Sequence, residues 1–311
     1  MSITESTIKN APDNNEIKIE GNEKRKVPKG MPKVPMTLLV VGKKGAGKTH
    51  AIANMVRKYQ SNKKCPAFDP QNVFVLSPTY HLDPTQSLIV ADEENVYDTK
   101  DGLEDPILEI QDKIEADMEE YDEWLEKMKA WELFKIWDKD TGLFPPDLLL
   151  KIYDPITESI QKPTNDFPCG KPSSLIFIDD QVGQGGMNAA GNSVLTNFSI
   201  KHRHYNCSMI YLVQHYKGIS RAIRGNVSII MLFKTHDEKI LDEIAKEVAG
   251  EVSREDFMKL YEFATRKPYN FLLISLNAND DDKFRRNFNK RLTIGNINDN
   301  GRGNDNENKG V

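Results

Sequence analysis

The segment at positions 42–49 constrains the fold of this chain more than any other. It reads Gly-Lys-Lys-Gly-Ala-Gly-Lys-Thr, follows an apolar run at residues 37–41 and precedes a segment with helical spacing. Glycine permits backbone conformations in which successive N–H groups point towards one centre, and a helix that begins at such a turn adds the positive end of its dipole. A strand, a glycine-rich turn and a helix in this order predict a loop that binds phosphate.

The side chains of this loop predict a nucleoside triphosphate bound together with Mg²⁺. Lys48 can place its ammonium on the β- and γ-phosphates, and the Thr49 hydroxyl can bind the metal. The residues that we expect to bind the nucleotide are Gly42, Lys43, Lys44, Gly45, Ala46, Gly47, Lys48, Thr49 and His50. The alternative is a chance glycine-rich turn, which requires the glycines, the lysine, the hydroxyl residue and both flanking elements to coincide.

The 311 residues are enough for one large α/β domain or two small ones, and we favour one domain with tails. Residues 1–33 are polar and basic and predict a flexible N-terminal arm, while residues 296–311 predict a disordered C-terminal tail. The P-loop domain is expected at residues 34–295, with a helical insertion at about residues 81–170. No run approaches the roughly 18 apolar residues of a membrane span, and the N-terminus lacks a signal-peptide core.

The cysteines predict neither a zinc site nor a disulfide framework. Cys65, Cys169 and Cys207 form no Cys-x-x-Cys pair, and their number is odd. A reducing compartment therefore fits best.

The formal net charge of −5 hides a segregation of charge along the chain. Residues 92–126 are rich in carboxylates, and only two lysines offset them. Residues 181–236 contain no carboxylate at all. The basic residues of that second stretch are Lys201, Arg203, Lys217, Arg221, Arg224 and Lys234. We therefore expect a positive face there.

Six apolar runs predict the strands of the sheet. They lie at residues 36–41, 73–76, 175–178, 209–213, 227–233 and 271–276. Continuous apolar runs suit strands that are buried on both faces, and helical patterns separate several of them. The expected fold class is therefore α/β, with a mostly parallel sheet covered by helices.

The long interval before the third run contains its own helical pattern. Apolar residues with three-four spacing run from Ile107 through Ile110, Ile114, Met118, Tyr121 and Leu125 to Met128, with acidic flanks. This pattern predicts an amphipathic helix inserted into the domain. Its apolar stripe either packs on the core of the protein itself or contacts a subunit or partner.

Two carboxylates follow the apolar run at residues 175–178. Asp179 is placed to hold Mg²⁺, and Asp180 to orient the water that attacks the γ-phosphate. The alternative is that the pair caps a turn. Gln214 follows the next apolar run, where its amide can sense the γ-phosphate if that strand lies between the other two. A glutamine at the end of a strand can instead simply bond to a loop.

These motifs together resemble the FtsK/HerA superfamily of DNA-pumping ATPases. They are the loop at 42–49, Ile178-Asp179-Asp180, Arg203-His204 and Gln214. The closer resemblance is to the poxvirus-type genome-packaging ATPases of large DNA viruses and their virophage relatives. An Ile-Arg-x-Asn stretch at residues 223–226 and a Phe-Arg-x-Asn-Phe element at residues 284–288 add to it. The match spans about residues 34–295.

The resemblance implies a RecA-like core in which the strands that carry the loop and the aspartates flank the strand before Gln214. It implies that Asp180 is the catalytic acid and that subunits form a homo-oligomeric ring, a hexamer or pentamer. An arginine from one subunit then completes the site of its neighbour. The arginines considered for this role are Arg203, Arg221 and Arg224, each of which can instead contact DNA phosphate or be a solvated surface charge. The long acidic insertion departs from the family pattern.

The function that these inferences favour is an ATP-driven translocase that packages double-stranded DNA into a capsid. Its partners are then DNA of any sequence and capsid or portal-vertex proteins, and its location is the viral factory of the host cytoplasm and the virion. A P-loop kinase or an ATP-dependent switch or scaffold is the alternative. The acidic insertion does not suit a kinase lid, and residues 289–292 lack the last aspartate of the Asn-Lys-x-Asp motif of GTPases.

Overall fold

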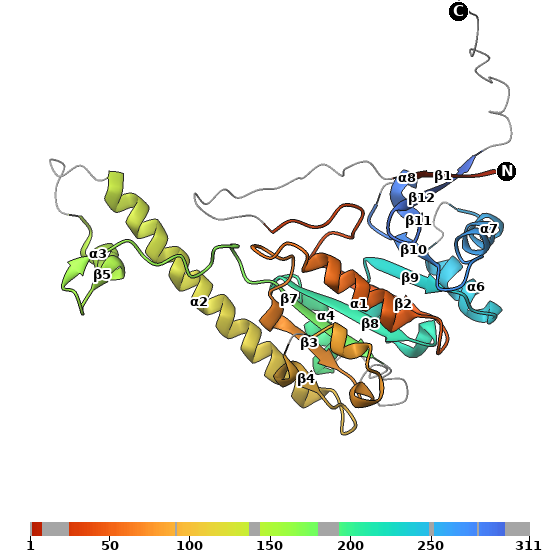
Figure 1. The fold of residues 1–311 in the computed structure, drawn as a ribbon, viewed down its shortest axis with the longest axis horizontal. Helices are drawn as coiled ribbons and strands as arrows, with labels where there is room; N and C mark the ends of the chain where they lie inside the picture. Colours follow the sequence, from red (N-terminus) through yellow and green to blue (C-terminus); the bar gives the residue numbers. More distant parts are fainter. Residues whose placement is uncertain are drawn as a thin grey trace, which may run out of the picture.

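The computed structural model describes residues 2–7, 25–90, 92–136, 144–179, 193–248, 252–278 and 280–295. Ten strands form one sheet within these residues (Figure 1). They are β1 (Ser2–Thr7), β2 (Thr37–Val41), β3 (Val73–Leu76), β4 (Val96–Tyr97), β7 (Ser174–Asp179), β8 (Cys207–Val213), β9 (Ile229–Phe233), β10 (Phe271–Ser275), β11 (Phe284–Arg286) and β12 (Lys290–Gly295). Their order across the sheet is β1-β12-β11-β10-β9-β2-β8-β7-β3-β4.

The central strands of the sheet are parallel. Parallel pairing joins β9, β2, β8, β7, β3 and β4, whereas β10, β11, β12 and β1 add antiparallel. The six predicted apolar runs are β2, β3, β7, β8, β9 and β10, so these predictions are confirmed. Because β8 lies between β2 and β7, the arrangement is the RecA-like P-loop NTPase core that the resemblance implied.

Helices cover both faces of the sheet, because alternate side chains of each buried strand point to opposite faces. Leu38 and Val40 pack with Ile52 of α1 (Lys48–Tyr59) on one face. Leu39 and Val41 belong to the cluster on the other face. The helices that contribute to that second cluster are α2 (Glu104–Ile136), α4 (Val194–Lys201), α5 (Arg221–Arg224), α6 (Glu238–Val248) and α7 (Arg254–Ala264).

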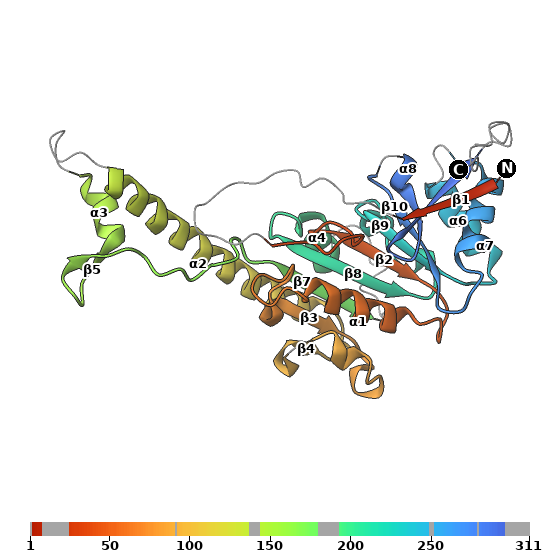
Figure 2. The ribbon, with the colours of Figure 1, turned by 45° about the horizontal axis from the view of Figure 1, so that its top comes forward.

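The predicted insertion helix is present as α2, and its apolar stripe packs on the protein itself. Ile107, Ile110 and Ile114 are buried in the cluster on the sheet. Farther along, Tyr121 packs in a separate small cluster with Phe167. In both ribbon views α2 leads away from the sheet to α3 (Pro146–Ile152) and to the hairpin of β5 (Tyr153–Asp154) and β6 (Ser159–Ile160) (Figure 2).

The prediction that residues 1–33 form a flexible arm is wrong for two parts of that segment. Residues 2–7 form β1, which pairs antiparallel with β12 because the edge of a sheet offers unpaired backbone groups to a further strand. The Arg25 guanidinium is held by both carboxylate oxygens of Asp69, at 2.7 and 2.9 Å. Residues 8–24 and the predicted tail at 296–311 lie outside the described residues.

Short helical turns complete the connections. They are η1 (Pro70–Asn72), η2 (Tyr80–Leu82), η3 (Gln86–Leu88), η4 (Glu93–Asn95), η6 (Tyr216–Gly218) and α8 (Asp280–Lys283). No helix in the described part of the chain has the length and apolar character needed to cross a membrane.

A disulfide joins Cys65 to Cys169, which corrects the prediction from the cysteine pattern. The Cα atoms are 5.3 Å apart, although 104 positions separate the two residues in sequence. The chain leaves the sheet after β4, passes through α2 and the hairpin of β5 and β6, and returns just before β7. This return brings Cys169 beside Cys65, which lies in the connection between α1 and β3. Cys207 is buried as a free thiol, so the odd number of cysteines does not exclude one pair.

Removing this disulfide is expected to lower the free energy of unfolding by about 2–4 kcal/mol, because the bond closes a long loop and restricts the unfolded chain. The measurement is urea unfolding of the full chain with and without reductant. The double variant Cys65→Ala/Cys169→Ala is the control, and reductant should leave its stability unchanged. With Cys65 and Cys169 paired, the unreduced, unfolded protein should have one reactive thiol, that of Cys207. A count of three reactive thiols would contradict the pairing.

Candidate active site

The loop at residues 42–49 has the backbone of a phosphate cradle. Gly45 and Gly47 have φ angles of +79° and +91°, a region that residues with a Cβ rarely occupy. The Ala46 N–H donates to the Lys43 carbonyl and closes the turn. Helix α1 begins at Lys48, directly after Gly47, so the first N–H groups of the helix and the positive end of its dipole face the loop. The strand, turn and helix predicted from sequence are therefore in place.

Gly42 is required for a different reason, which is close packing. A Cβ at this position would lie 2.7 Å from the Phe233 Cβ, at the end of β9. The Gly42 N–H donates to the Val213 carbonyl, the last residue of β8, at 3.2 Å. The loop is thus attached to the strand that precedes Gln214.

The Lys48 side chain points back to the first residues of the loop. Its Nζ donates to the Gly42 carbonyl at 2.7 Å and to the Lys43 carbonyl at 3.1 Å. Since an ammonium bonds more strongly to a phosphate oxygen than to a neutral carbonyl, a triphosphate in the loop can take over these bonds. The residues present therefore fit the nucleotide.

The carboxyl end of β7 brings an acid to the same edge of the sheet. Asp179 ends β7 and pairs in register with Leu212 of β8, so it lies beside the residues that lead to Gln214. Its side chain is only 8% exposed. Gln214 is half-buried directly after β8. Asp180 and the glycine-rich segment after it lie outside the described residues, so the place of the predicted catalytic acid stays a prediction.

Gln86 is a residue of this site that the sequence did not indicate. It belongs to η3, is fully buried, and donates from Nε2 to Asp179 Oδ2 at 2.6 Å. Its Oε1 has no hydrogen-bond partner among the described residues. No motif surrounds Gln86, and 93 positions separate it from Asp179. Only the fold brings the two together.

The oxygen donors at this edge suit a magnesium ion. Mg²⁺ prefers hard oxygen ligands and is usually held by one or two protein groups together with phosphate oxygens. Thr49, in the first turn of α1, supplies a hydroxyl, and Asp179 supplies a carboxylate. These two residues are the ones that would hold the ion.

The three arginines considered for the neighbouring site differ in their surroundings. Arg224 is held by contacts within this chain: it donates to the Ile219 carbonyl, pairs with Glu247 at 3.4 Å and lies over the Tyr216 ring. Arg203 and Arg221 are exposed.

The expected positive face is interrupted by carboxylates from a later helix. Lys217 pairs with Glu243 at 2.8 Å, and Arg224 pairs with Glu247, both from α6. The absence of acids between residues 181 and 236 therefore does not translate into a uniform positive surface. Among the exposed basic residues of this stretch, Lys201 and Arg203 form no ion pair with α6 in the described part of the chain. Lys201 ends α4, and Arg203 lies between α4 and β8.

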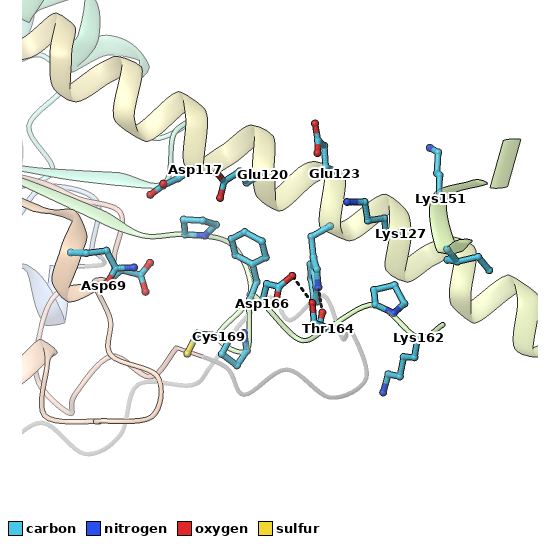
Figure 3. Close-up of a pocket in the computed structure, with 18 of the residues that line it drawn as sticks. Asp69, Asp117, Glu120, Glu123, Lys127, Lys151, Lys162, Thr164, Asp166 and Cys169 are labelled. Carbon is cyan, nitrogen blue, oxygen red and sulfur yellow. Dashed lines mark hydrogen bonds between the residues drawn. The ribbon is translucent and has the colours of Figure 1, made fainter. Parts of the chain in front are cut away.

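A large pocket of the described residues lies away from the phosphate loop, between α2 and the chain that returns from the insertion (Figure 3). Its volume is about 1110 Å³. Lysines and carboxylates both line it, including Lys127, Lys162, Asp117 and Glu123. Because charges of both signs mix there, the pocket does not select an anion as the loop does.

No family model and no curated protein matches the sequence. Among solved structures, the genome-packaging NTPase B204 from Sulfolobus turreted icosahedral virus 2 in complex with ATP-gammaS has a TM-score of 0.42 and 16% identity, over 79% of this chain and 94% of that chain. The N-terminal domain of zonular occludens toxin from Neisseria meningitidis has a TM-score of 0.29 and 13% identity, over 66% and 79%. EssC (ATPases 2 and 3) from Geobacillus thermodenitrificans has a TM-score of 0.42 and 12% identity, over 82% and 39%. At this level of likeness, the function must rest on the residues of the site.

Proposed function

We propose that this chain is a magnesium-dependent ATPase that drives the movement of double-stranded DNA. The observation that supports the ATPase best is the strand order β2-β8-β7, which gathers the phosphate loop, Gln214 and Asp179 at one edge of the sheet. Parallel strands bind ligands at this carboxyl edge because loop backbone and helix N-termini converge there.

Each residue of the site has a distinct role in the proposed reaction. The Lys48 ammonium and the loop N–H groups stabilise negative charge on the β- and γ-phosphates. Bound Mg²⁺ supplies further neutralisation of that charge, and Thr49 and Asp179 would hold it. Asp180 accepts a proton from the attacking water and orients it, while Gln214 reports whether the γ-phosphate is present.

A second subunit completes this site in the proposal. Because Arg224 is used within its own subunit, Arg203 and Arg221 are the better residues to reach a neighbouring γ-phosphate. Arg203 lies in the connection before β8, at the amino edge of the sheet, opposite the phosphate loop of its own chain. It can therefore serve only the site of another subunit, as in a ring of identical chains.

The grip on DNA is proposed for the same amino edge. Lys171 lies shortly before β7 and donates to the His204 carbonyl at 3.1 Å, which joins it to the connection that carries Lys201 and Arg203. These cations can bind the phosphate backbone without reading bases, as a motor that accepts every sequence requires. Strands β7 and β8 then link the DNA edge to the nucleotide edge. Capsid or portal proteins are the proposed partners of the assembled ring.

The test of this function is ATP hydrolysis by the full chain with and without long duplex DNA, over a series of salt concentrations. Stimulation by DNA that fades as salt rises is expected, because binding to phosphates releases counterions. Hydrolysis that is indifferent to DNA would contradict the DNA motor and favour a switch, and binding of ATP without hydrolysis would favour a scaffold.

Removing two lysines of the amino edge is expected to weaken DNA stimulation while basal hydrolysis stays unchanged. In Lys171→Ala/Lys201→Ala, the salt dependence of DNA binding should fall by about one in slope for each DNA phosphate that the variant no longer binds. The matched control is Lys127→Ala/Lys129→Ala on α2, which lies outside the connections that lead into β7 and β8. Equal DNA stimulation in the two double variants would place the grip elsewhere.

Gln86→Leu is expected to raise the Mg²⁺ concentration needed for half-maximal hydrolysis by about tenfold, as loss of a group that orients a metal ligand typically does. Leucine keeps the size of the buried side chain but cannot donate to Asp179 Oδ2. Gln111→Leu on α2 is the control, because the Gln111 side chain donates to Glu115 one turn along the same helix and not to a residue of the proposed site. An unchanged Mg²⁺ requirement, with both variants equally stable, would show that Gln86 has no part in positioning Asp179.

A further inference from the structure

Tyr269 lies beside the phosphate loop, although no motif includes it. It precedes β10, which pairs antiparallel with β9 so that Phe271 lies opposite Phe233. Phe233 ends β9 and packs against Gly42 of the loop. The connection between α7 and β10 is therefore placed at the same carboxyl edge of the sheet as the proposed nucleotide site.

The Tyr269 ring directly contacts the last glycine of the loop. A Cβ built on Gly47 would lie 2.9 Å from the Tyr269 Cδ1 atom. Even so, the tyrosine is 73% exposed, so most of its ring is open to solvent. An aromatic ring in this position adds little to the core, since it buries only a minor part of its surface.

The backbone at Tyr269 is held in an uncommon conformation. Its φ angle is +63°, a region that bulky residues rarely occupy. The Asn287 side chain fixes the two residues that follow: its amide donates to the Asn270 side chain, and its Oδ1 accepts from the Phe271 N–H. Strain of this kind clusters where a side chain must be held in one place for function.

The orientation of the nucleotide follows from the strand order. Asp179 ends β7 and Gln214 follows β8, both on one side of β2, and the two side chains would face the terminal phosphate. The other end of the nucleotide then extends towards the opposite side of β2, where β9 and β10 lie. Tyr269 is an exposed aromatic residue on that side, and its ring lies beside Gly47 of the loop.

We propose that the ring of Tyr269 is the platform on which the base of the bound nucleoside triphosphate stacks. This inference rests on the proposed nucleotide site. The ring offers a π face that any base can use, so the platform contributes affinity rather than a choice between bases. Gly47 is needed for both the loop and the platform. Only a glycine at this position permits the left-handed turn of the loop and also lets the Tyr269 ring approach closely.

The test compares ATP with inorganic tripolyphosphate, which carries the phosphates but no base. Binding of each to the full chain is measured by calorimetry for the wild type, Tyr269→Ala and Tyr269→Phe. In Tyr269→Ala the dissociation constant for ATP should rise by about five- to tenfold, the lower end of what one stacked base contributes. The dissociation constant for tripolyphosphate should not change, and Tyr269→Phe should keep the wild-type affinity for both ligands. Tyr153→Ala, which removes an exposed tyrosine at the far end of the insertion, is the matched control.

The outcomes separate this inference from the proposed function. Unchanged or tighter ATP binding in Tyr269→Ala would overturn the platform alone, and so would an equal loss for both ligands, which would mean that the ring acts on the loop rather than on the base. If the wild type bound neither ATP nor tripolyphosphate, the nucleotide site itself would be wrong. Tyr269 is mostly exposed, so the melting temperatures of all variants should stay close to that of the wild type.

Discussion

Lys48→Ala is expected to reduce ATP turnover by at least about a thousandfold, the size of effect that a cation on the transferring phosphoryl group produces in related chemistry. The substitution removes the ammonium that bonds to the Gly42 and Lys43 carbonyls beside the phosphate cradle. The negative charge that develops on the phosphates then loses its positive counterpart in the loop. The measurement is steady-state phosphate release by the full chain at saturating Mg²⁺ and ATP.

The fold should survive this change, because Lys48 is a partly exposed residue at the start of α1 and outside the hydrophobic clusters. Its unfolding midpoint should therefore stay near that of the wild type. Lys129→Ala, an exposed lysine on α2, is the control for the loss of one positive charge and should retain full turnover. Wild-type turnover in Lys48→Ala would refute the role of the loop in catalysis.

Asp179→Asn is expected to lower turnover by about 10²- to 10³-fold, comparable to the loss of one electrostatic group from a preorganised site. Asparagine has the shape of aspartate and keeps an oxygen that can accept from Gln86, so the buried contact persists. The lost negative charge weakens the hold on Mg²⁺. The Mg²⁺ concentration for half-maximal turnover should rise in the same variant.

Asp242→Asn provides the matched control, because Asp242 is a surface carboxylate of α6 that pairs with Arg254 and is not one of the residues expected to hold Mg²⁺. That variant should behave as the wild type. If Asp179→Asn needed no more Mg²⁺ than the wild type, Asp179 would not be a metal ligand.

The nucleotide edge of this fold was predictable because its signals are local. The phosphate loop is a continuous segment, and the buried parallel strands read as unbroken apolar runs. Their order could not be derived from periodicity. It came from the family resemblance, and the position of β8 between β2 and β7 confirms it.

The missed strands lie at or near the two edges of the sheet, and β11 and β12 carry several polar side chains. β12 contains Lys290, Arg291 and Thr293, and β11 contains two arginines, so neither forms an apolar run. β4 has only two residues. Such strands are specified by the neighbour with which they pair rather than by their own composition.

Contacts between segments that are distant in the sequence could not be predicted from it either. The Gln86–Asp179 bond and the Cys65–Cys169 bridge both depend on how the insertion leaves and returns to the sheet. The same holds for charge, since the acids of α6 meet Lys217 and Arg224 only in the folded chain. The segregation of charge along a sequence therefore predicts the charge of a surface poorly when a helix from a later part of the chain packs against that surface.

The most direct measurement is a crystal structure of the full chain with a nonhydrolysable ATP analogue and Mg²⁺. It should show the phosphates enclosed by residues 42–49, with the metal between the Thr49 hydroxyl and the Asp179 carboxylate. A nucleotide bound at another place, with the glycine loop empty and Asp179 turned away from it, would contradict the account.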